Sequence, residues 1–403
     1  MKPRAAEAPT PPTHRTGASG VDDGSTPHPV RYRRNPDLLL EWQDEAGPVL
    51  VECRRWRRFT ARPRLLALLN ELDRPLTAEE AHARWRGPVP NTDGSGAADL
   101  AATQRALDQL AAAGIIRSSA HPTPTAQGLT PYELAAHARA GQGPAAHTQQ
   151  GSPPPARLRH PEAAETIRLA DHDELPSRPL REVLTERRSI RAFAPSPLPL
   201  GHLGVFLARS ARVRAPLGPL WFQQTQRPSP SGGGRHSLEA YVIARDVSGL
   251  APGAYHYDPF DHTLNRLAPW DDELATVLNT TVTTPAYMEH PPPASLLLAS
   301  HAARTGWKYA GLALSLIYRD TGCLLQTLCL TATDLGLGAC PTGTMRPTSQ
   351  IAFLKGRHEE LLHVGNLALG LPGPEGSGEA PTPSRETTGN DQGISAHGPV
   401  NGG

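Results

Sequence analysis

The sequence is poor in cysteine, with four among its 403 residues: Cys53, Cys323, Cys329 and Cys340. No two of them form a Cys-x-x-Cys pair, and none lies near a histidine at the spacing of zinc ligands. A disulfide framework and a structural zinc site are therefore not expected, and we predict no metal site. Free thiols suit a reducing cytoplasm, which is where we expect the protein to be.

Aromatic residues, net charge and long apolar runs are scarce as well. Phe, Trp and Tyr make up 5% of the residues, so Leu, Ala and Val must build most of the core. The 40 Lys and Arg residues nearly equal the 39 Asp and Glu residues, which leaves no bulk field for nucleic acid or anionic lipid. No apolar run approaches the roughly 18 residues of a membrane helix, and the N-terminus lacks a signal-peptide core. The sequence predicts a soluble protein with neither a nucleic-acid nor a membrane partner.

Proline and glycine are abundant but unevenly spread, with 43 and 37 residues. Segments rich in them and poor in large apolar residues cannot bury enough surface to offset their ordering entropy. We therefore expect disordered tails at residues 1–35 and 373–403. A similar stretch at residues 120–179 predicts a linker, interrupted by a docking helix near residues 131–140. Two folded domains remain, at residues 36–119 and 180–372.

The first domain has the signals of a hairpin followed by three helices. Apolar residues alternate in two short runs around a turn, which is typical of a β-hairpin. Thr77 and Glu80 have the spacing of a capping box, and Pro63 suits the first turn of a helix. The expected strands lie at residues 38–42 and 49–51, and the third helix at residues 99–113.

Three helices that end in a short strand suggest a winged helix-turn-helix. DNA binding is the usual role of that shape, and peptide recognition is a second one. Arg105 is the one cation of the third helix, which makes it a poor helix for reading a DNA groove. We therefore predict peptide recognition over DNA binding.

The second domain combines helices with well-separated strands, which predicts an α+β domain around a sheet. Strands are expected at residues 238–245, 254–257 and 363–369. A long apolar helix is expected at residues 322–335, followed by a tight turn at residues 338–343 with exposed backbone donors. By itself this helix and turn indicate no more than a core helix and its exit.

Three motifs of the second domain could carry chemistry. Three guanidiniums and a hydroxyl within residues 187–191 could bind a phosphate group, although a solvated basic helix end has the same composition. The glycines of residues 230–237 would allow close approach to a flat or anionic ligand, although a flexible loop has them too. The pair Lys308-Tyr309 could supply a base and a proton donor if burial lowers the lysine pKa, although most such pairs leave the lysine in water.

The order of these motifs resembles that of the SagB-type peptide dehydrogenases, FMN enzymes of the nitroreductase fold that mature ribosomal peptides containing thiazole and oxazole. The resemblance covers roughly residues 180–371, and the ordered set is far more specific than any one motif. The matching segments are Arg187-Arg188-Ser189-Ile190-Arg191, Pro230-Ser231-Gly232-Gly233-Gly234-Arg235-His236-Ser237-Leu238-Glu239, residues 249–259, Lys308-Tyr309, Gly322 with Gln326-Thr327, residues 336–340, Val364-Gly365 and Leu369-Gly370.

The resemblance implies FMN-dependent oxidation of peptide thiazolines or oxazolines to thiazoles or oxazoles. Lys308 would be the catalytic base that removes a ring proton and Tyr309 its partner, with dioxygen as the final oxidant. It also implies a homodimer with two FMN sites at the subunit interface, an N-terminal region that recognises the precursor peptide, and a cyclodehydratase partner. The FMN-binding residues that it implies are Arg187, Arg188, Ser189, Arg191, Pro230, Ser231, Gly232, Gly233 and Gly343.

The sequence departs from the family pattern in three places. Leu314 stands where an aromatic residue is frequent, residues 344–346 replace a run rich in Gly and Asp, and Asn366 replaces a frequent glutamate. Three alternatives stay open. They are a nitro- or quinone reductase that uses NAD(P)H, a non-catalytic scaffold that binds the precursor peptide, and a winged-helix regulator.

Overall fold

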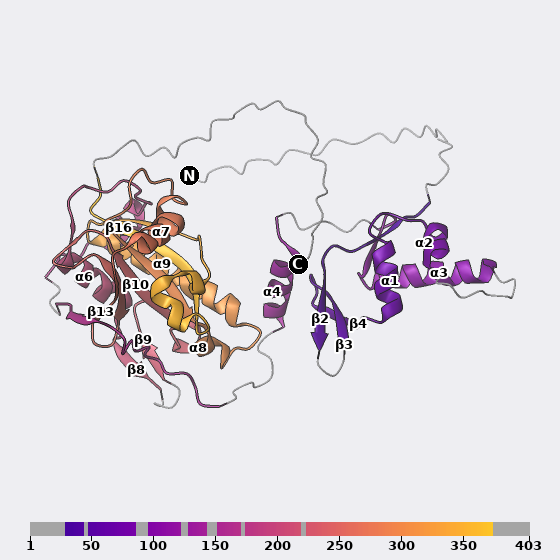
Figure 1. Ribbon diagram of the computed structural model, residues 1–403, viewed down its shortest axis with the longest axis horizontal. Helices are drawn as coiled ribbons and strands as arrows, with labels where there is room; N and C mark the ends of the chain where they lie inside the picture. Colours follow the sequence, from indigo (N-terminus) through magenta and orange to yellow (C-terminus); the bar gives the residue numbers. More distant parts are fainter. Residues whose placement is uncertain are drawn as a thin grey trace, which may run out of the picture. The chain divides into compact units, whose positions relative to one another are not determined.

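A computed structural model describes residues 29–43, 47–85, 96–121, 128–142, 151–170, 174–218 and 223–373. Of the tails expected at residues 1–35 and 373–403, residues 1–28 and 374–403 lie outside the described residues. Residues 32–34, however, form a strand that pairs with residues 116–118, and Tyr32 is buried, so the first folded unit begins before residue 36. The chain divides into two compact units, residues 1–138 and 139–403, and each is described by itself (Figure 1).

The first unit consists of two small sheets and helices. The strands β2, β3 and β4 form an antiparallel sheet, and β1 pairs with β5. The hairpin of β2 and β3 confirms the prediction made from the alternating apolar residues. Part of its turn, residues 44–46, lies outside the described residues. The elements are β1 (Tyr32–Arg34), β2 (Leu38–Gln43), β3 (Gly47–Glu52), β4 (Arg57–Thr60), α1 (Pro63–Glu71), α2 (Ala78–Trp85), α3 (Gly96–Ala112), β5 (Ile116–Ser118) and α4 (Pro131–Gly141).

Local sequence signals determine where the helices of this unit begin. The Thr77 hydroxyl accepts a hydrogen bond from the Glu80 amide (3.2 Å), and the Glu80 carboxylate accepts one from the Thr77 amide (2.9 Å). This is the capping box that the sequence predicts, and Pro63 is the first residue of α1. Between the sheets and helices lies a core of Leu, Ile and Ala side chains with Tyr32. The helix expected near residues 131–140 is α4, and its Leu134 and Ala135 pack against Cys53.

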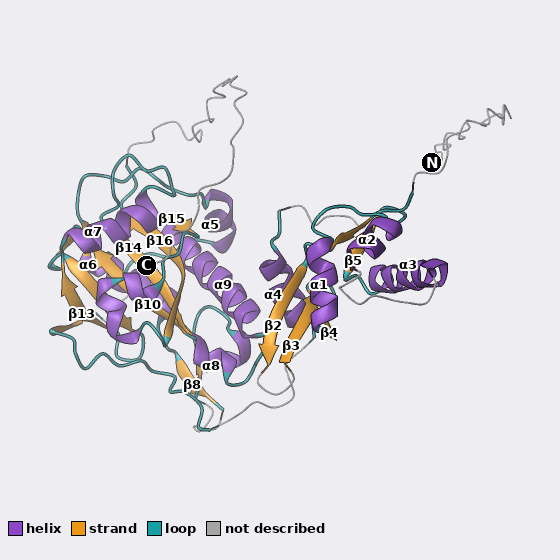
Figure 2. Ribbon diagram, turned by 45° about the vertical axis from the view of Figure 1, so that its right-hand side comes forward, coloured by secondary structure: helices purple, strands orange, loops and turns teal. Residues whose placement is uncertain are grey.

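The second unit is built on a seven-stranded sheet in the order β15-β16-β14-β10-β12-β13-β6, with every neighbouring pair antiparallel. Helices lie on both faces of this sheet (Figure 2). The strands of the unit are β6 (Glu165–Arg168), β7 (Leu198–Pro199), β8 (Ala215–Leu217), β9 (Gln224–Gln226), β10 (Leu238–Ala244), β11 (Val247–Ser248), β12 (Gly253–Asp258), β13 (Thr263–Pro269), β14 (Ala294–His301), β15 (Gly338–Thr342) and β16 (Leu361–Gly370). The helices are α5 (Leu180–Glu186), α6 (Leu200–Ala211), η2 (Gly232–Gly234), α7 (Asp272–Leu278), η3 (Asn279–Thr283), α8 (Ala302–Gly306), α9 (Ala313–Asp334), η4 (Thr348–Gln350) and η5 (Ala352–Arg357).

Each face of the sheet buries its own hydrophobic cluster. Alternate residues of β10 point to opposite faces, as a pleated strand requires. Val242 joins the cluster that contains α6 and α9, whereas Ile243 joins the cluster that contains α7 and η5. The unit therefore has three layers, helix on sheet on helix, which agrees with the α+β expectation.

The segment expected to be a linker differs from its prediction. Residues 165–168 form β6, the edge strand that pairs with β13, and Leu158, His160 and Leu169 are buried. The composition is misleading because this segment contributes backbone groups and only a few apolar side chains to the unit. Residues 151–170 therefore belong to the second folded unit.

Two further expectations require correction. Residues 338–342 form the strand β15, not a tight turn, and β15 is an edge strand, where Pro341 is tolerated. Its Gly338 is needed for packing, since an added Cβ would lie 2.8 Å from Cγ2 of Ile190. The long helix begins at Ala313, nine residues before the predicted start, because Ile317 and Thr321 continue its buried face. Within the described residues, no helix is both long and apolar enough to cross a bilayer.

Candidate functional site

The predicted phosphate-binding segment begins where α5 ends, at Arg187, and continues beside β15. The Ile190 amide donates to the Ala339 carbonyl (2.9 Å), which fixes the segment against the sheet edge. Arg188 and Arg191 are exposed, and Arg187 is half-buried. Arg187 and Arg188 line a groove of about 590 Å³ with Gly336 and Leu337. The structure thus gathers the guanidiniums at one end of α9, where they could hold an anionic group.

Two buried thiols lie under this segment. Burial raises the pKa of Cys329 to about 11, and the nearby Arg187 opposes that rise only partly. Burial also raises the pKa of Cys340, against the opposing effects of Arg191 and a hydrogen bond from Ser189. Both thiols stay protonated near neutral pH, so they support the segment by packing rather than as nucleophiles.

The predicted glycine-rich loop forms a compact turn held by one carboxylate of α9. Asp320 accepts hydrogen bonds from the Ser231 hydroxyl (2.6 Å) and from the Gly232 amide (3.0 and 3.1 Å). Ser231 in turn accepts from the His236 amide (2.9 Å). Burial raises the pKa of Asp320, and these two donors oppose the rise. Asp320 was not predicted as a site residue, yet it fixes the shape of the loop.

Tyr309 lies against the same loop. Gly233 adopts a left-handed conformation (φ 64°), and an added Cβ there would lie 2.7 Å from the Tyr309 hydroxyl oxygen. Lys308 and Tyr309 follow α8 in a turn, and both are half-buried. The Lys308 ammonium lies 5.3 Å from the centre of the Tyr309 ring. The structure therefore brings together two motifs that are about 75 residues apart in the sequence.

The phosphate segment and the glycine loop lie at different positions along α9. The loop contacts Asp320 near the start of the helix, whereas Arg187 lies near Cys329 and shares its groove with Thr333. With a rise of 1.5 Å per residue, Asp320 and Thr333 are roughly 20 Å apart along the helix axis. Within one chain, the predicted cofactor-binding residues therefore form two separate groups.

The loop after β15 contains Gly343, which is exposed. The Asn366 side-chain Nδ2 donates to the Thr344 backbone carbonyl (2.9 Å), and His363 Nδ1 accepts from the Arg346 backbone amide (3.0 Å). The other ring nitrogen of His363, Nε2, lies 2.8 Å from Asn366 Oδ1, which makes that nitrogen the donor. Asn366, where the family frequently has glutamate, thus holds the loop as a neutral hydrogen-bonding group.

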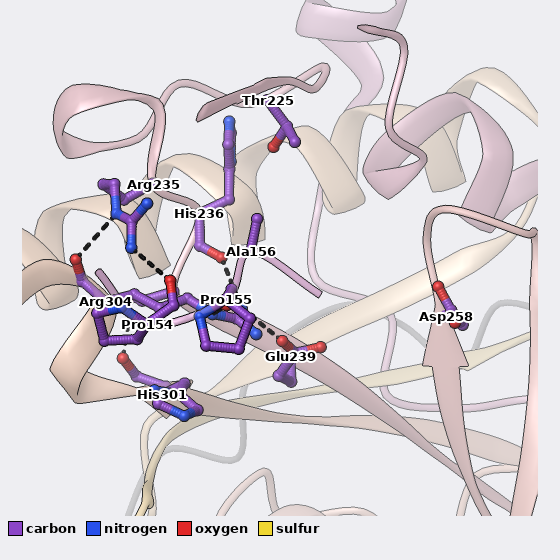
Figure 3. Close-up of polar contacts among 12 residues, drawn as sticks. Pro154, Pro155, Ala156, Thr225, Arg235, His236, Glu239, Asp258, His301 and Arg304 are labelled. Atoms are coloured by element: carbon purple, nitrogen blue, oxygen red, sulfur yellow. Dashed lines mark hydrogen bonds and ion pairs between the residues drawn. The ribbon is translucent and has the colours of Figure 1, made fainter. Parts of the chain in front are cut away.

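Two buried arginines complete the surroundings of the site, and sequence reasoning did not predict them. Arg304 forms an ion pair with Glu239 (2.5 Å), and His256 hydrogen-bonds to the same carboxylate (2.9 Å). Burial alone would raise the pKa of Glu239, but Arg304 and His256 outweigh it and lower the pKa to about 2. Arg235 belongs to the glycine-rich motif of the sequence, which could have marked it as a candidate site residue. No local sequence pattern distinguishes Arg304. Figure 3 shows Arg304 bonded to Glu239, and the Arg235 guanidinium beside the Arg304 carbonyl.

Among the described residues, no three His, Cys, Asp or Glu side chains gather as metal ligands would. The groups described above at the site are guanidiniums, backbone amides, a lysine and a tyrosine.

Comparison with known proteins identifies the second unit. The sequence pattern of the nitroreductase family matches residues 184–364 of this chain. A protein of Methanocaldococcus jannaschii named as a nitroreductase is 30% identical over 203 residues, which cover 50% of this chain and 92% of the relative.

Solved structures with a similar fold include a nitroreductase of Ralstonia eutropha, at 22% identity and a TM-score of 0.42, with 58% of this chain and 94% of that chain covered. The E. coli microcin synthetase McbBCD complex with truncated pro-MccB17 bound is another, at 16% identity and a TM-score of 0.39, with 54% and 78% covered. The archaeal relative, matched over nearly its whole length, shows that the chain belongs to the nitroreductase family of oxidoreductases.

Proposed function

We propose that this nitroreductase-family protein is an FMN-dependent dehydrogenase that oxidises azoline rings in a peptide to azoles. The observation that carries the proposal is the contact between the glycine loop and the Lys308-Tyr309 pair. A Cβ added at the left-handed Gly233 would collide with the Tyr309 hydroxyl, so the loop presents bare backbone beside this phenol. The Lys308 nitrogen lies 5.3 Å from the centre of the same ring. That is the arrangement needed to place a flat ring next to a base.

The residues present fit FMN when two copies of the chain combine. Arg187, Arg188 and Arg191 supply the charge that a phosphate group requires, and the loop at Gly233 supplies the close approach that a ring system requires. Because these groups lie roughly 20 Å apart along α9, we propose that each cofactor is held by the arginine segment of one copy and the glycine loop of the other.

The exposed face of α9 supports this homodimer. Leu314 and Tyr318 are 44% and 47% exposed, and Gly322 continues the same stripe at a spacing of four residues. Large apolar residues beside a glycine on one helix face favour close packing against another helix. The proposal is therefore that α9 packs against its copy.

In the proposed reaction, an azoline ring loses two electrons and two hydrogens. FMN, when bound, supplies the acceptor for the electron pair and one hydrogen, and dioxygen restores it. Lys308 removes the other hydrogen as a proton. Tyr309 positions Lys308, whose side-chain nitrogen lies 5.3 Å from the centre of the Tyr309 ring.

The first unit is the proposed docking site of the precursor peptide. Its groove of about 510 Å³ is lined by leucines of β2, β3 and α1, including Leu38, Leu50 and Leu66, together with the polar side chains of Arg34, Asn35 and Asn70. A groove beside a strand that offers both apolar and polar contacts suits an extended peptide. The cyclodehydratase that makes the azolines is the proposed protein partner, on the basis of the sequence resemblance.

The test begins with the visible spectrum of the purified full chain and the mass of its released chromophore. Bound FMN supports the proposal, whereas a colourless protein that takes up no added FMN contradicts it. Lys308→Ala should retain FMN and lose azole formation, and the exposed Lys355→Ala is the matched control that should retain both. Consumption of NAD(P)H with a nitroaromatic, without any change in an azoline peptide, would instead favour the small-molecule reductase.

A further inference from the structure

Residues 151–160, which we call the proline strap, run along the elements that carry the glycine loop and the Lys308-Tyr309 pair. The strap contains Pro153, Pro154 and Pro155 in succession. Proline has no backbone N–H, so this stretch offers carbonyl acceptors and no backbone donors. It therefore requires donors from the rest of the unit, and arginine is the side chain with the most donors.

Two buried arginines supply these donors. Arg235 and Arg304 are both 0% exposed. Arg235 donates to the Pro154 carbonyl (2.8 Å), and Arg304 donates to the Pro155 carbonyl (2.7 Å). Figure 3 shows Pro154 and Pro155 next to each other, with the Arg235 guanidinium bonded to the Pro154 carbonyl.

The same two arginines also join the glycine loop to α8 directly. Arg235, which follows the loop, donates to the Arg304 carbonyl (3.2 Å), and Arg304 donates to the His236 carbonyl (3.2 Å). The pair is thus reciprocal, because each guanidinium binds the backbone of the other's segment. A guanidinium has several N–H donors in one plane, so it can bind a partner segment and the strap at the same time. A lysine ammonium lacks this planar arrangement of donors.

The strap also reaches the residue next to the proposed base. The indole N–H of Trp307 donates to the Gly151 carbonyl (3.2 Å), and the Arg235 guanidinium lies 5.8 Å from the Trp307 ring centre. At its other end, Arg157 pairs with Asp258 (2.6 Å). The strap is therefore fixed on both sides of its prolines, and one of its ends lies beside Lys308.

We propose that the proline strap is a positioning element of the site, which acts through Arg235 and Arg304 to hold the Lys308-Tyr309 turn at a fixed distance from the glycine loop. This inference rests on the proposed function, because it assigns the strap a part in placing the base. Neither arginine touches substrate in this scheme, so both are positioning residues and not catalytic ones.

The experiment is Arg235→Lys in the full chain, with Arg245→Lys as the matched control. Arg245 also donates to a proline carbonyl, that of Pro292 (3.0 Å). It follows the last residue of β10, however, whereas Arg235 precedes the first, so it lies at the other end of the strand. The first readout is trypsin cleavage after Arg157 and Arg159, located by mass spectrometry, which requires neither FMN nor turnover. The second is the division of any defect between kcat and KM for an azoline peptide.

We expect Arg235→Lys to lose protection of the strap and to lower kcat about tenfold or more with KM unchanged, because a small misplacement of a base mainly affects the chemical step. Arg245→Lys should do neither. A strap that stays protected, or one that opens while kcat is unchanged, would overturn the inference.

If Arg235→Lys does not fold, Trp307→Phe makes the same test, since it removes the indole donor to Gly151 and replaces the large ring beside Arg235 with a smaller one. A loss of strap protection together with a lower kcat supports the inference, and the absence of either overturns it. A wild-type chain that has a protected strap but no azoline oxidation would refute the proposed function. The cleavage data for the variants would still show whether the arginines hold the strap.

Discussion

Asp320 provides a quantitative test of how the glycine loop is held. Asp320→Ala removes the acceptor of the Ser231 hydroxyl and the Gly232 amide. Hydrogen bonds to a charged group contribute about 1.5–3 kcal/mol each, but the raised pKa of Asp320 indicates that burial of its charge offsets part of that gain. We therefore expect a net loss of about 2 kcal/mol of unfolding free energy, which lowers Tm by about 4–8 °C in a unit of this size.

The assay combines thermal unfolding with hydrogen exchange of the Gly232 amide. Asp334→Ala is the control, because Asp334 lies on the same helix and accepts a hydrogen bond from the Arg178 amide (2.7 Å) away from the loop. Both variants should lose stability, but only Asp320→Ala should accelerate exchange at Gly232. Unchanged protection of that amide in Asp320→Ala would show that the carboxylate does not hold the loop.

Three further predictions concern the loop, acid stability and assembly. Gly233→Ala should weaken FMN binding, because the added Cβ displaces Tyr309, whereas a Cβ at Gly306 meets open space and Gly306→Ala should leave binding unchanged. Equal FMN dissociation constants for the two variants would contradict this. Burial lowers the pKa of His236 to about 3 and of His160 to about 4, so below pH 6.5 the folded state binds fewer protons than the unfolded chain. The second unit should thus lose stability as pH falls from 6.5 towards 4, by up to about 1.4 kcal/mol per pH unit for each histidine. A midpoint of urea unfolding that does not change over this pH range would refute the prediction. Gly322→Arg should turn the proposed dimer into a monomer, as measured by light scattering. A dimer that persists would exclude α9 as the interface.

The elements with strong local signals could be predicted from the sequence. The capping box at Thr77 and the helix start at Pro63 depend on residues within four positions of each other, so the sequence alone contains the whole interaction. The strand β10 could be predicted from its continuous apolar run. The ordered motifs also predicted the nitroreductase fold, and the archaeal relative bears out membership of that wider family. The narrower resemblance to the SagB-type dehydrogenases stays a prediction.

The features that escaped prediction depend on partners far away in the sequence. Asp320 is a site residue only because its loop partners, 88 and 89 positions earlier, donate to it. Residues 338–342 have the composition of a turn, and they are a strand because β16 supplies the pairing. The prolines at 153–155 resemble a linker because the donors that order them, Arg235 and Arg304, lie about 80 and 150 positions later.

The edge strand β6 has a consequence for any attempt to isolate the nitroreductase-family unit of this chain. The family match begins at residue 184, after β6 and after the proline strap. A fragment cut there would expose the backbone of β13, from Thr263 to Arg266, as an unprotected strand edge, and such edges promote intermolecular pairing. It would also remove the strap carbonyls that Arg235 and Arg304 bind, which leaves one buried donor of each guanidinium without its acceptor. We therefore expect such a fragment to aggregate on expression, whereas one that starts near residue 143 should stay in solution, so the boundary of homology is not the boundary of folding.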